Sequence, residues 1–135
     1  MSKSNTTEND ILLMTLVGTD PSWRAGATIY IALHTADPGE AGSAVTNEAD
    51  YTSYARVGVT KATGWTDGGS SFTNSGLISF PQCTGGSNAL TYGSIVTTSA
   101  GAGQIIYSGA LGATLNVANL ITPQFAIGAI TVTED

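Results

Sequence analysis

The chain has few charged residues of either sign, and this shortage limits its partners. Asp, Glu, Lys and Arg make up only 10% of its 135 residues, whereas about 25% is typical of soluble domains. Four of these residues are basic and ten are acidic, which gives a net charge of −6. Nucleic-acid binding relies on Lys and Arg to neutralise phosphates, so the composition argues against a nucleic-acid partner.

Cysteine and long apolar runs are also scarce. Cys83 is the only cysteine, which excludes an intramolecular disulfide and a cysteine-rich metal site and is compatible with folding in a reducing cytoplasm. The apolar stretch at residues 11–17 is far shorter than the roughly 20 residues that span a bilayer. The polar residues before it do not form a secretory signal. We therefore expect no membrane partner.

Residues that support catalysis are equally few. His34 is the only histidine, and the sequence contains no Gly-x-Ser-x-Gly, His-Glu-x-x-His or Cys–His pattern. A histidine at the end of a strand is expected to satisfy backbone carbonyls of the following turn. Two carboxylates could still approach each other after folding, as glycoside hydrolysis requires, so a small hydrolase ranks last among three hypotheses. We predict no enzyme activity, no cofactor and no small-molecule substrate.

Four carboxylates lie in one loop, at Asp37, Glu40, Glu48 and Asp50. Calcium needs about six to eight oxygen ligands at defined spacing, and this loop lacks the Asp-x-Asp-x-Asp-Gly pattern. Turn chemistry explains the run at residues 37–39 better, because Pro fixes φ and Gly accepts a positive φ. We expect no metal here, and we expect Arg56 to form an ion pair with an acid from this loop.

What the sequence has in abundance is alternation with a period of two. Apolar and other residues alternate through residues 29–34 and 56–60, as in half-buried strands. Further candidate strands are residues 76–80, 90–98, 104–111, 115–117, 124–127 and 130–133, and turn-forming residues separate them. This pattern predicts an all-β fold, an antiparallel β-sandwich of jelly-roll-like form with one short N-terminal helix.

The domain organisation follows from the length and from the N-terminal pattern. We expect a single β-sandwich domain over residues 1–135, since a chain of this length can bury an adequate core. Residues 1–10 are predicted to form an N-terminal arm and residues 11–18 a short helix. Thr6 or Thr7 is expected to cap the helix, and Gly18 is expected to end it.

Two motifs carry a resemblance to a known family. Residues 33–39 read Leu-His-Thr-Ala-Asp-Pro-Gly, and residues 54–56 read Tyr-Ala-Arg. With these motifs the chain resembles small bacteriophage virion structural proteins, which include capsid decoration and tail-fibre-like proteins. The Tyr-Ser-Gly-Ala-Leu run at residues 107–111 and residues 130–133 are also similar to that family. The resemblance therefore covers nearly the whole chain.

The resemblance implies a virion structural protein, and a neutral, hydroxyl-rich surface suits broad contacts with neighbouring subunits. Our preferred hypothesis is a capsid decoration (cement) protein on the outer capsid surface. It would be a homotrimer that binds the major capsid protein of the same phage at capsomer junctions. The alternative is a tail-fibre or receptor-binding component that recognises a host surface glycan. Either protein would be made in the host bacterial cytoplasm.

Candidate interface residues lie in the N-terminal arm, in the acidic loop and among the aromatic residues. Aromatic side chains serve in both cores and interfaces. Alternation directs Tyr30 away from Ile29 and Ile31, and Trp65 lies beside a glycine-rich loop, so we expect these two aromatic side chains to be exposed. The predicted interface residues are Thr6, Thr7, Tyr30, Asp37, Glu40, Glu48, Tyr51, Tyr54, Arg56 and Trp65.

Overall fold

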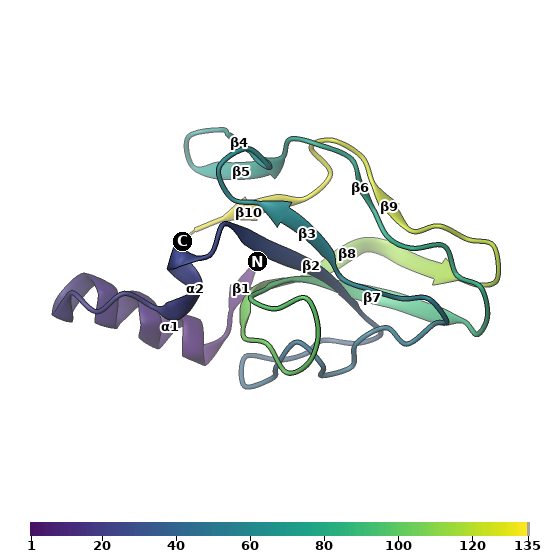
Figure 1. The fold of residues 1–135 in the computed structure, drawn as a ribbon, viewed down its shortest axis with the longest axis horizontal. Helices are drawn as coiled ribbons and strands as arrows, with labels where there is room; N and C mark the ends of the chain where they lie inside the picture. Colours follow the sequence, from purple (N-terminus) through teal and green to yellow (C-terminus); the bar gives the residue numbers. More distant parts are fainter. Residues whose placement is uncertain (135) are drawn as a thin grey trace.

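The larger of the two β layers is a five-stranded antiparallel sheet (Figure 1). The structure is a computed structural model that describes residues 1–134. The strands, in their order across the sheet, are β1 (Ser2–Lys3), β8 (Ile105–Val117), β7 (Asn88–Val96), β2 (Thr28–His34) and β3 (Val57–Thr60). The two predicted segments at residues 104–111 and 115–117 are one continuous strand, β8.

Two smaller antiparallel sheets form the second layer over one face of the large sheet. The first contains β10 (Thr131–Thr133), β5 (Ser71–Asn74) and β4 (Trp65–Asp67), and the second contains β6 (Ile78–Ser79) and β9 (Gln124–Phe125). The fold is therefore the predicted all-β sandwich. Strands β4 and β5 are an addition to the prediction, which placed no strand between residues 60 and 76 and treated Thr66, Asp67 and Asn74 as turn residues.

The main core lies between the two layers. Ile31 and Leu33 of β2 face it and are almost completely buried, while Ala32 faces the opposite side of the sheet and packs with Ala44. Phe80 lies at the centre of an aromatic group, stacked on Tyr54 with ring centroids 6.3 Å apart and edge-on to Phe125. Burial of these large side chains supplies the main favourable free energy of folding.

The N-terminal helix begins earlier than predicted. Helix α1 (Asn5–Leu12) continues without a break into the π-helical turn η1 (Leu13–Val17). The predicted arm at residues 1–10 is therefore largely helical, and the cap is Ser4 rather than Thr6 or Thr7. The Ser4 hydroxyl accepts a hydrogen bond from the backbone N–H of Thr7 at 3.3 Å. Residues 2 and 3 pair with Ser108 and Tyr107 of β8 as strand β1.

The end of this helix is the predicted one. Gly18 has a φ of 78° and closes the helix through a hydrogen bond from its N–H to the carbonyl of Leu13. A left-handed residue at this position satisfies carbonyls that the helix leaves free. A second, short helix, α2 (Ser22–Ala25), follows and leads into β2. Figure 1 shows the first helix projecting from one end of the sandwich.

Candidate functional site

The acidic loop, residues 35–56, folds back against β2 and buries the single histidine. His34 is completely buried. One ring nitrogen, Nδ1, lies 2.9 Å from the carbonyl oxygen of Thr46, and the other, Nε2, lies 2.7 Å from the hydroxyl of Ser94. A carbonyl only accepts, so Nδ1 donates and Nε2 accepts from Ser94. The predicted bond between this histidine and a turn carbonyl is confirmed.

Burial also determines the charge of this histidine. It lowers the pKa of His34 below its ordinary value, and the opposing effects of the Thr46 carbonyl and of Glu48 are smaller. The imidazole is therefore neutral and is held by two internal hydrogen bonds. These two hydrogen bonds tie the loop to the sheet, since Thr46 belongs to the loop and Ser94 to β7.

The strongest polar contact of the loop is the ion pair between Glu48 and Arg56, as predicted for Arg56. Two hydrogen bonds join them, from Nε to Oε1 at 2.6 Å and from Nη2 to Oε2 at 2.8 Å. Arg56 also donates to the carbonyls of Thr98 and Gly101. The hydrogen bonds from Arg56 to Glu48 raise the pKa of the arginine further. Such a bidentate, nearly buried pair fixes geometry because every donor has a partner.

Tyr54 completes this network. Its hydroxyl accepts from the backbone N–H of Leu33 at 3.1 Å and donates to Glu48 at 3.1 Å. Burial raises the pKa of Tyr54, and Glu48 adds to that effect. The run Tyr54-Ala55-Arg56 therefore attaches the acidic loop to β2, which gives the second sequence motif a structural role.

The other acids of the loop are dispersed rather than gathered. The Asp37 side chain accepts from the N–H of Gly39 at 2.8 Å, as turn chemistry predicts. Glu40 accepts from Ser2, and Asp50 accepts from Asn88. Within residues 1–134, no three Asp, Glu, His or Cys side chains meet in an arrangement suited to a metal ion.

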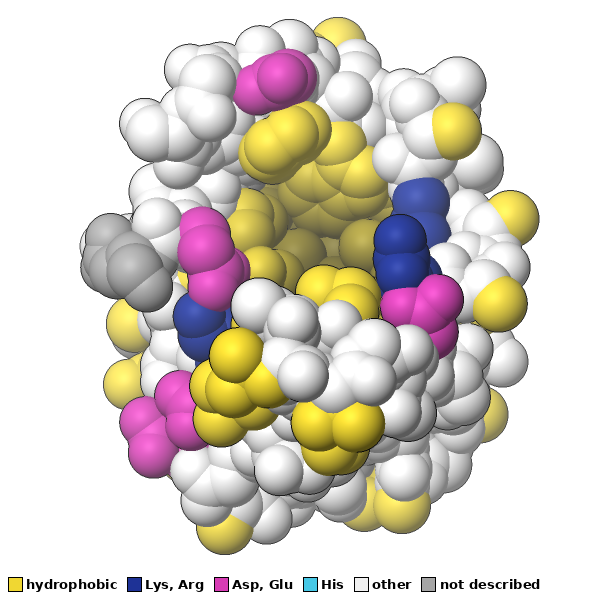
Figure 2. Space-filling model, turned by 90° about the vertical axis from the view of Figure 1, so that its left-hand side faces the viewer, with side chains coloured by type: hydrophobic (Ala, Val, Ile, Leu, Met, Phe, Trp, Pro, Cys, Tyr) yellow, Lys and Arg dark blue, Asp and Glu magenta, His cyan; other side chains and the backbone are white. Residues whose placement is uncertain are grey.

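An apolar hollow lies at the opposite end of β2, beside the projecting helix (Figure 2). Its volume is about 310 Å³, and its lining is mostly apolar. The side chains come from both layers and from the two helices; the main ones are Ile11, Trp23, Ile29, Trp65, Phe72 and Val132. Figure 2 shows charged side chains on both sides of its rim. Sequence reasoning did not find this hollow, because its residues are far apart in the sequence.

The polar groups of the hollow already have partners, with one exception. Thr7 donates to the carbonyl of Ile105 at 2.8 Å, the Lys61 ammonium donates to backbone carbonyls of α2, and the Tyr107 hydroxyl donates to Glu134 at 2.6 Å. The exception is the buried Nε1–H of Trp65, which has no acceptor within residues 1–134. The hollow is therefore suited to an apolar occupant that also offers a single acceptor.

The helix next to the hollow carries exposed apolar side chains. Leu16 and Val17 are 77% and 68% exposed, and Leu12 and Leu13 lie beside them on the last turns. Contiguous exposed apolar side chains of this kind mark interaction sites on soluble proteins. We call the hollow together with Leu12, Leu13, Leu16 and Val17 the apolar end of the molecule.

The predicted interface residues have different surroundings. Among those named earlier, Thr6, Asp37 and Glu40 are exposed, whereas Thr7 and Tyr51 are fully enclosed by the chain. The expected exposure of Tyr30 and Trp65 is wrong: both are half-buried, because Tyr30 packs on the cluster that contains Ala44 and Trp65 lines the hollow. The interface roles of all these residues stay predictions.

These features define a class of protein. The chain is a β-sandwich whose buried polar groups hold a loop in place, and its prominent surface feature is an apolar end. Within residues 1–134 the helices are too short and too polar to cross a bilayer. Exposed apolar surface of this kind is typical of sites where a protein contacts a partner.

Comparison with models of protein families shows which family the chain belongs to. A model of the family described as podophage GP4 fiber I protein gp80 matches residues 2–133. The chain therefore belongs to this family, and it is a structural protein of a bacteriophage virion. No curated protein matches the chain. The predicted virion assignment is confirmed.

Proposed function

We propose that the protein is a component of the podophage tail fibres. The observation that carries this proposal is the match to a fibre protein family over residues 2–133. The alternative hypothesis from the sequence, a tail-fibre component, thus has direct support in the family description. The preferred hypothesis from the sequence, capsid decoration through the major capsid protein, stays a prediction, as does the homotrimer.

The apolar end supplies the means of attachment in this proposal. A virion component is held in the particle by its contacts with neighbouring subunits, and apolar burial is the main favourable term in such association. Leu12, Leu13, Leu16 and Val17 project beyond the sandwich, and the hollow lies beside them. We infer that a neighbouring virion protein with an apolar surface covers this end.

The same hollow is poorly suited to a host glycan. Sugars are bound through many hydrogen bonds combined with aromatic stacking, whereas the hollow supplies aromatic side chains and a single free donor, the Nε1–H of Trp65. Its Thr7, Lys61 and Tyr107 groups are engaged within the chain. Glycan recognition by this protein stays a prediction, and the apolar end favours a protein as the neighbour.

Virions that carry substituted copies of the protein test this proposal. Leu16→Glu places a carboxylate on the apolar end. Leu120→Glu is the control, because it makes the same change at a side chain that is exposed to a similar extent: Leu120 is 69% exposed and Leu16 is 77% exposed. Leu120 lies in the loop between β8 and β9, away from the helix. We expect Leu16→Glu to lower the copies per virion at least about tenfold, a loss equivalent to about 1.4 kcal/mol.

Quantitative mass spectrometry of purified virions measures this incorporation, and circular dichroism of the free variants checks that both fold. Leu120→Glu should be incorporated like the unchanged protein. Equal incorporation of the two variants would contradict attachment through the apolar end. Retention of the protein on capsids that lack tails would contradict the fibre assignment itself and favour the decoration hypothesis.

A further inference from the structure

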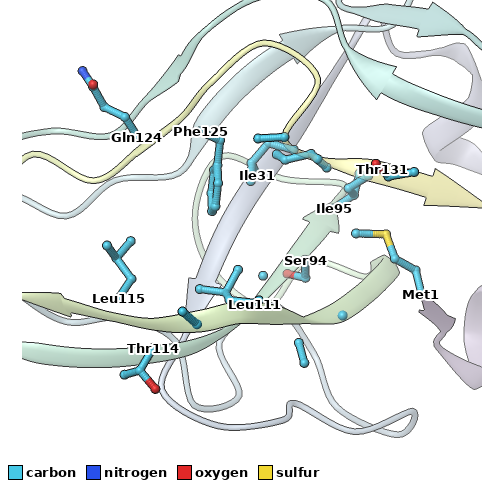
Figure 3. A pocket seen from close by; sticks show the side chains of 17 residues that line it. Met1, Ile31, Ser94, Ile95, Leu111, Thr114, Leu115, Gln124, Phe125 and Thr131 are labelled. Atoms are coloured by element: carbon cyan, nitrogen blue, oxygen red, sulfur yellow. The ribbon is translucent and has the colours of Figure 1, made fainter.

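The apolar end contains two features of matching shape and chemistry, a projecting helix tip and the hollow. The helix tip consists of Leu12, Leu13, Leu16 and Val17, whose spacings of three and four residues bring them together on the helix surface. Figure 1 shows that the first helix carries this tip away from the sandwich, and Figure 2 shows that the hollow opens on the same end of the molecule. By contrast, the larger cleft between the layers beside β8 (Figure 3) has no such projecting segment among its lining residues.

The helix tip is also the uncompensated negative end of a helix dipole. The last carbonyls of a helix lack partners within it and give its C-terminus a partial negative charge. The last turn contains no basic residue, and residues 4–23 contain no Lys or Arg. In the described part of the chain, no backbone N–H beyond the helix donates to the carbonyls of residues 14–17. A cation from another molecule would therefore be favourable beside this tip.

The hollow supplies a cation of this kind. Among the residues that line it, Lys61 alone is charged. The Lys61 ammonium lies 5.8 Å from the centre of the Trp23 ring and donates to the carbonyls of Trp23 and Arg24. The other three basic residues of the chain each pair with a carboxylate, whereas Lys61 has no carboxylate partner within residues 1–134. The hollow is therefore complementary to the helix tip both in its apolar lining and in its charge.

We propose that the neighbour at the apolar end is a second copy of this chain, and that each copy places its helix tip in the hollow of the other. This inference rests on the attachment role proposed above for the apolar end. Since the tip and the hollow lie side by side on one end of the molecule, a two-fold axis between them brings each tip to a hollow at the same time. A two-fold contact requires a surface that is self-complementary in this way. The carboxyl end of each helix then approaches Lys61 of the other copy.

A second copy is favoured because it covers the whole apolar end. A partner that offered only a projecting apolar segment would fill the hollow but leave Leu16 and Val17 in water. A partner that offered only a hollow would cover these side chains and leave the hollow empty. The two-fold pair buries both features of both copies and brings each unpaired ammonium to the negative end of a helix dipole.

The tryptophans of the protein provide a direct measure of whether the hollow is occupied. Trp23 and Trp65 are its only two tryptophans, and both line the hollow. Their fluorescence emission should shift to shorter wavelength when a helix tip displaces water from around them. Sedimentation equilibrium on the same samples gives the mass, which should be about twice 13.7 kDa at about 100 μM chain. On dilution the mass and the emission should return together to the values of the single chain.

Leu16→Ala tests the contact, because it shortens the most exposed side chain of the tip without adding a charge. We expect it to raise the dissociation constant of the dimer at least about tenfold. Leu120→Ala is the control at a similarly exposed leucine and should leave the dimer unchanged, while circular dichroism confirms that both variants fold. An unchanged protein of single-chain or trimeric mass would overturn the proposal. So would a dimer whose tryptophan emission equals that of the single chain, or a Leu16→Ala dimer of unchanged affinity.

These outcomes are separate from those that test the fibre proposal. If the free protein is a monomer and Leu16→Glu is still lost from virions, the second copy is overturned and attachment through the apolar end stands. If the free protein is a dimer through its hollows and remains on capsids that lack tails, the two-fold contact stands and the fibre assignment is contradicted.

Discussion

At the residue scale, the ion pair between Glu48 and Arg56 is the contact whose loss should matter most. The Arg56 side chain is only 1% exposed, so a neutral partner leaves a buried guanidinium without its counter-charge. Breaking such a pair costs about 3 kcal/mol. We expect Glu48→Gln to lower the free energy of unfolding by about that amount, measured by urea denaturation at pH 7.

The control for this substitution is Glu40→Gln in the same loop. The Glu40 side chain is exposed and accepts a hydrogen bond from the Ser2 hydroxyl. Exposed substitutions of this kind usually change stability by less than about 0.5 kcal/mol. If Glu48→Gln and Glu40→Gln lower the free energy of unfolding by similar amounts, the ion pair between Glu48 and Arg56 does not stabilise the acidic loop.

A second prediction at this scale concerns pH. Burial lowers the pKa of His34 from its ordinary 6.5, against smaller opposing effects of the Thr46 carbonyl, Glu48 and Asp37, while Arg56 adds to the lowering. Below about pH 6.5 the unfolded chain binds a proton that the folded chain does not. The free energy of unfolding should therefore fall as the pH drops from 6.5 towards the lowered pKa, and this contribution should be constant above pH 6.5.

The matching variant is His34→Gln, which has no imidazole to titrate. Its free energy of unfolding should depend less steeply on pH between about pH 6.5 and 4.5 than that of the unchanged protein. Urea titrations at several pH values measure both slopes. Parallel curves for the two proteins would show that His34 does not titrate differently in the folded and unfolded chain.

Some of these residue roles could be predicted from the sequence. The single histidine after an alternating strand and the arginine after an acidic loop each had one obvious type of partner, and both partners were found. The exposure of Tyr30 and Trp65 was not predictable, because residues from other parts of the chain cover them. Alternation assigns a side chain to one face of a sheet but does not say what packs on that face.

At the scale of elements, the end of the N-terminal helix gives a clear prediction. Gly18 has a φ of 78°, and a Cβ there would meet no atom within 4 Å. The penalty for Gly18→Ala is therefore backbone strain alone, about 1 kcal/mol. Thermal unfolding should show a lower midpoint for this variant.

Gly76→Ala is the control, since Gly76 also has open space around it but no positive φ. Its midpoint should stay the same or rise slightly, because alanine restricts the unfolded chain. If the midpoint of thermal unfolding falls equally in the two variants, the left-handed conformation of Gly18 does not cause the effect of Gly18→Ala.

Elements were predictable where the local pattern and the tertiary contacts agree. Strands β2 and β3 alternate clearly and lie in the large sheet. Strands β4 and β5 were missed, since their Thr, Asp, Ser and Asn residues favour turns and the two strands form only by pairing with each other and with β10. The helix start was missed because the helix is held there by contacts of Ser4 and Thr7 with Ile105, distant in the sequence.

At the scale of the whole molecule, two regions have separate roles in this account. The acidic loop is fixed by the contacts of His34, Tyr54 and the Glu48–Arg56 pair, and we propose that the apolar end joins the protein to a neighbouring virion protein. The two regions lie at opposite ends of β2. Substitutions in them should therefore act independently.

Cryo-electron microscopy of the intact virion tests the central claim most directly, since the sandwich and its projecting helix have a recognisable shape. The account predicts density for this chain in the tail fibres, with the α1 end buried against a neighbouring protein. Density at capsomer junctions, or density in the fibres with the α1 end facing solvent, would contradict it.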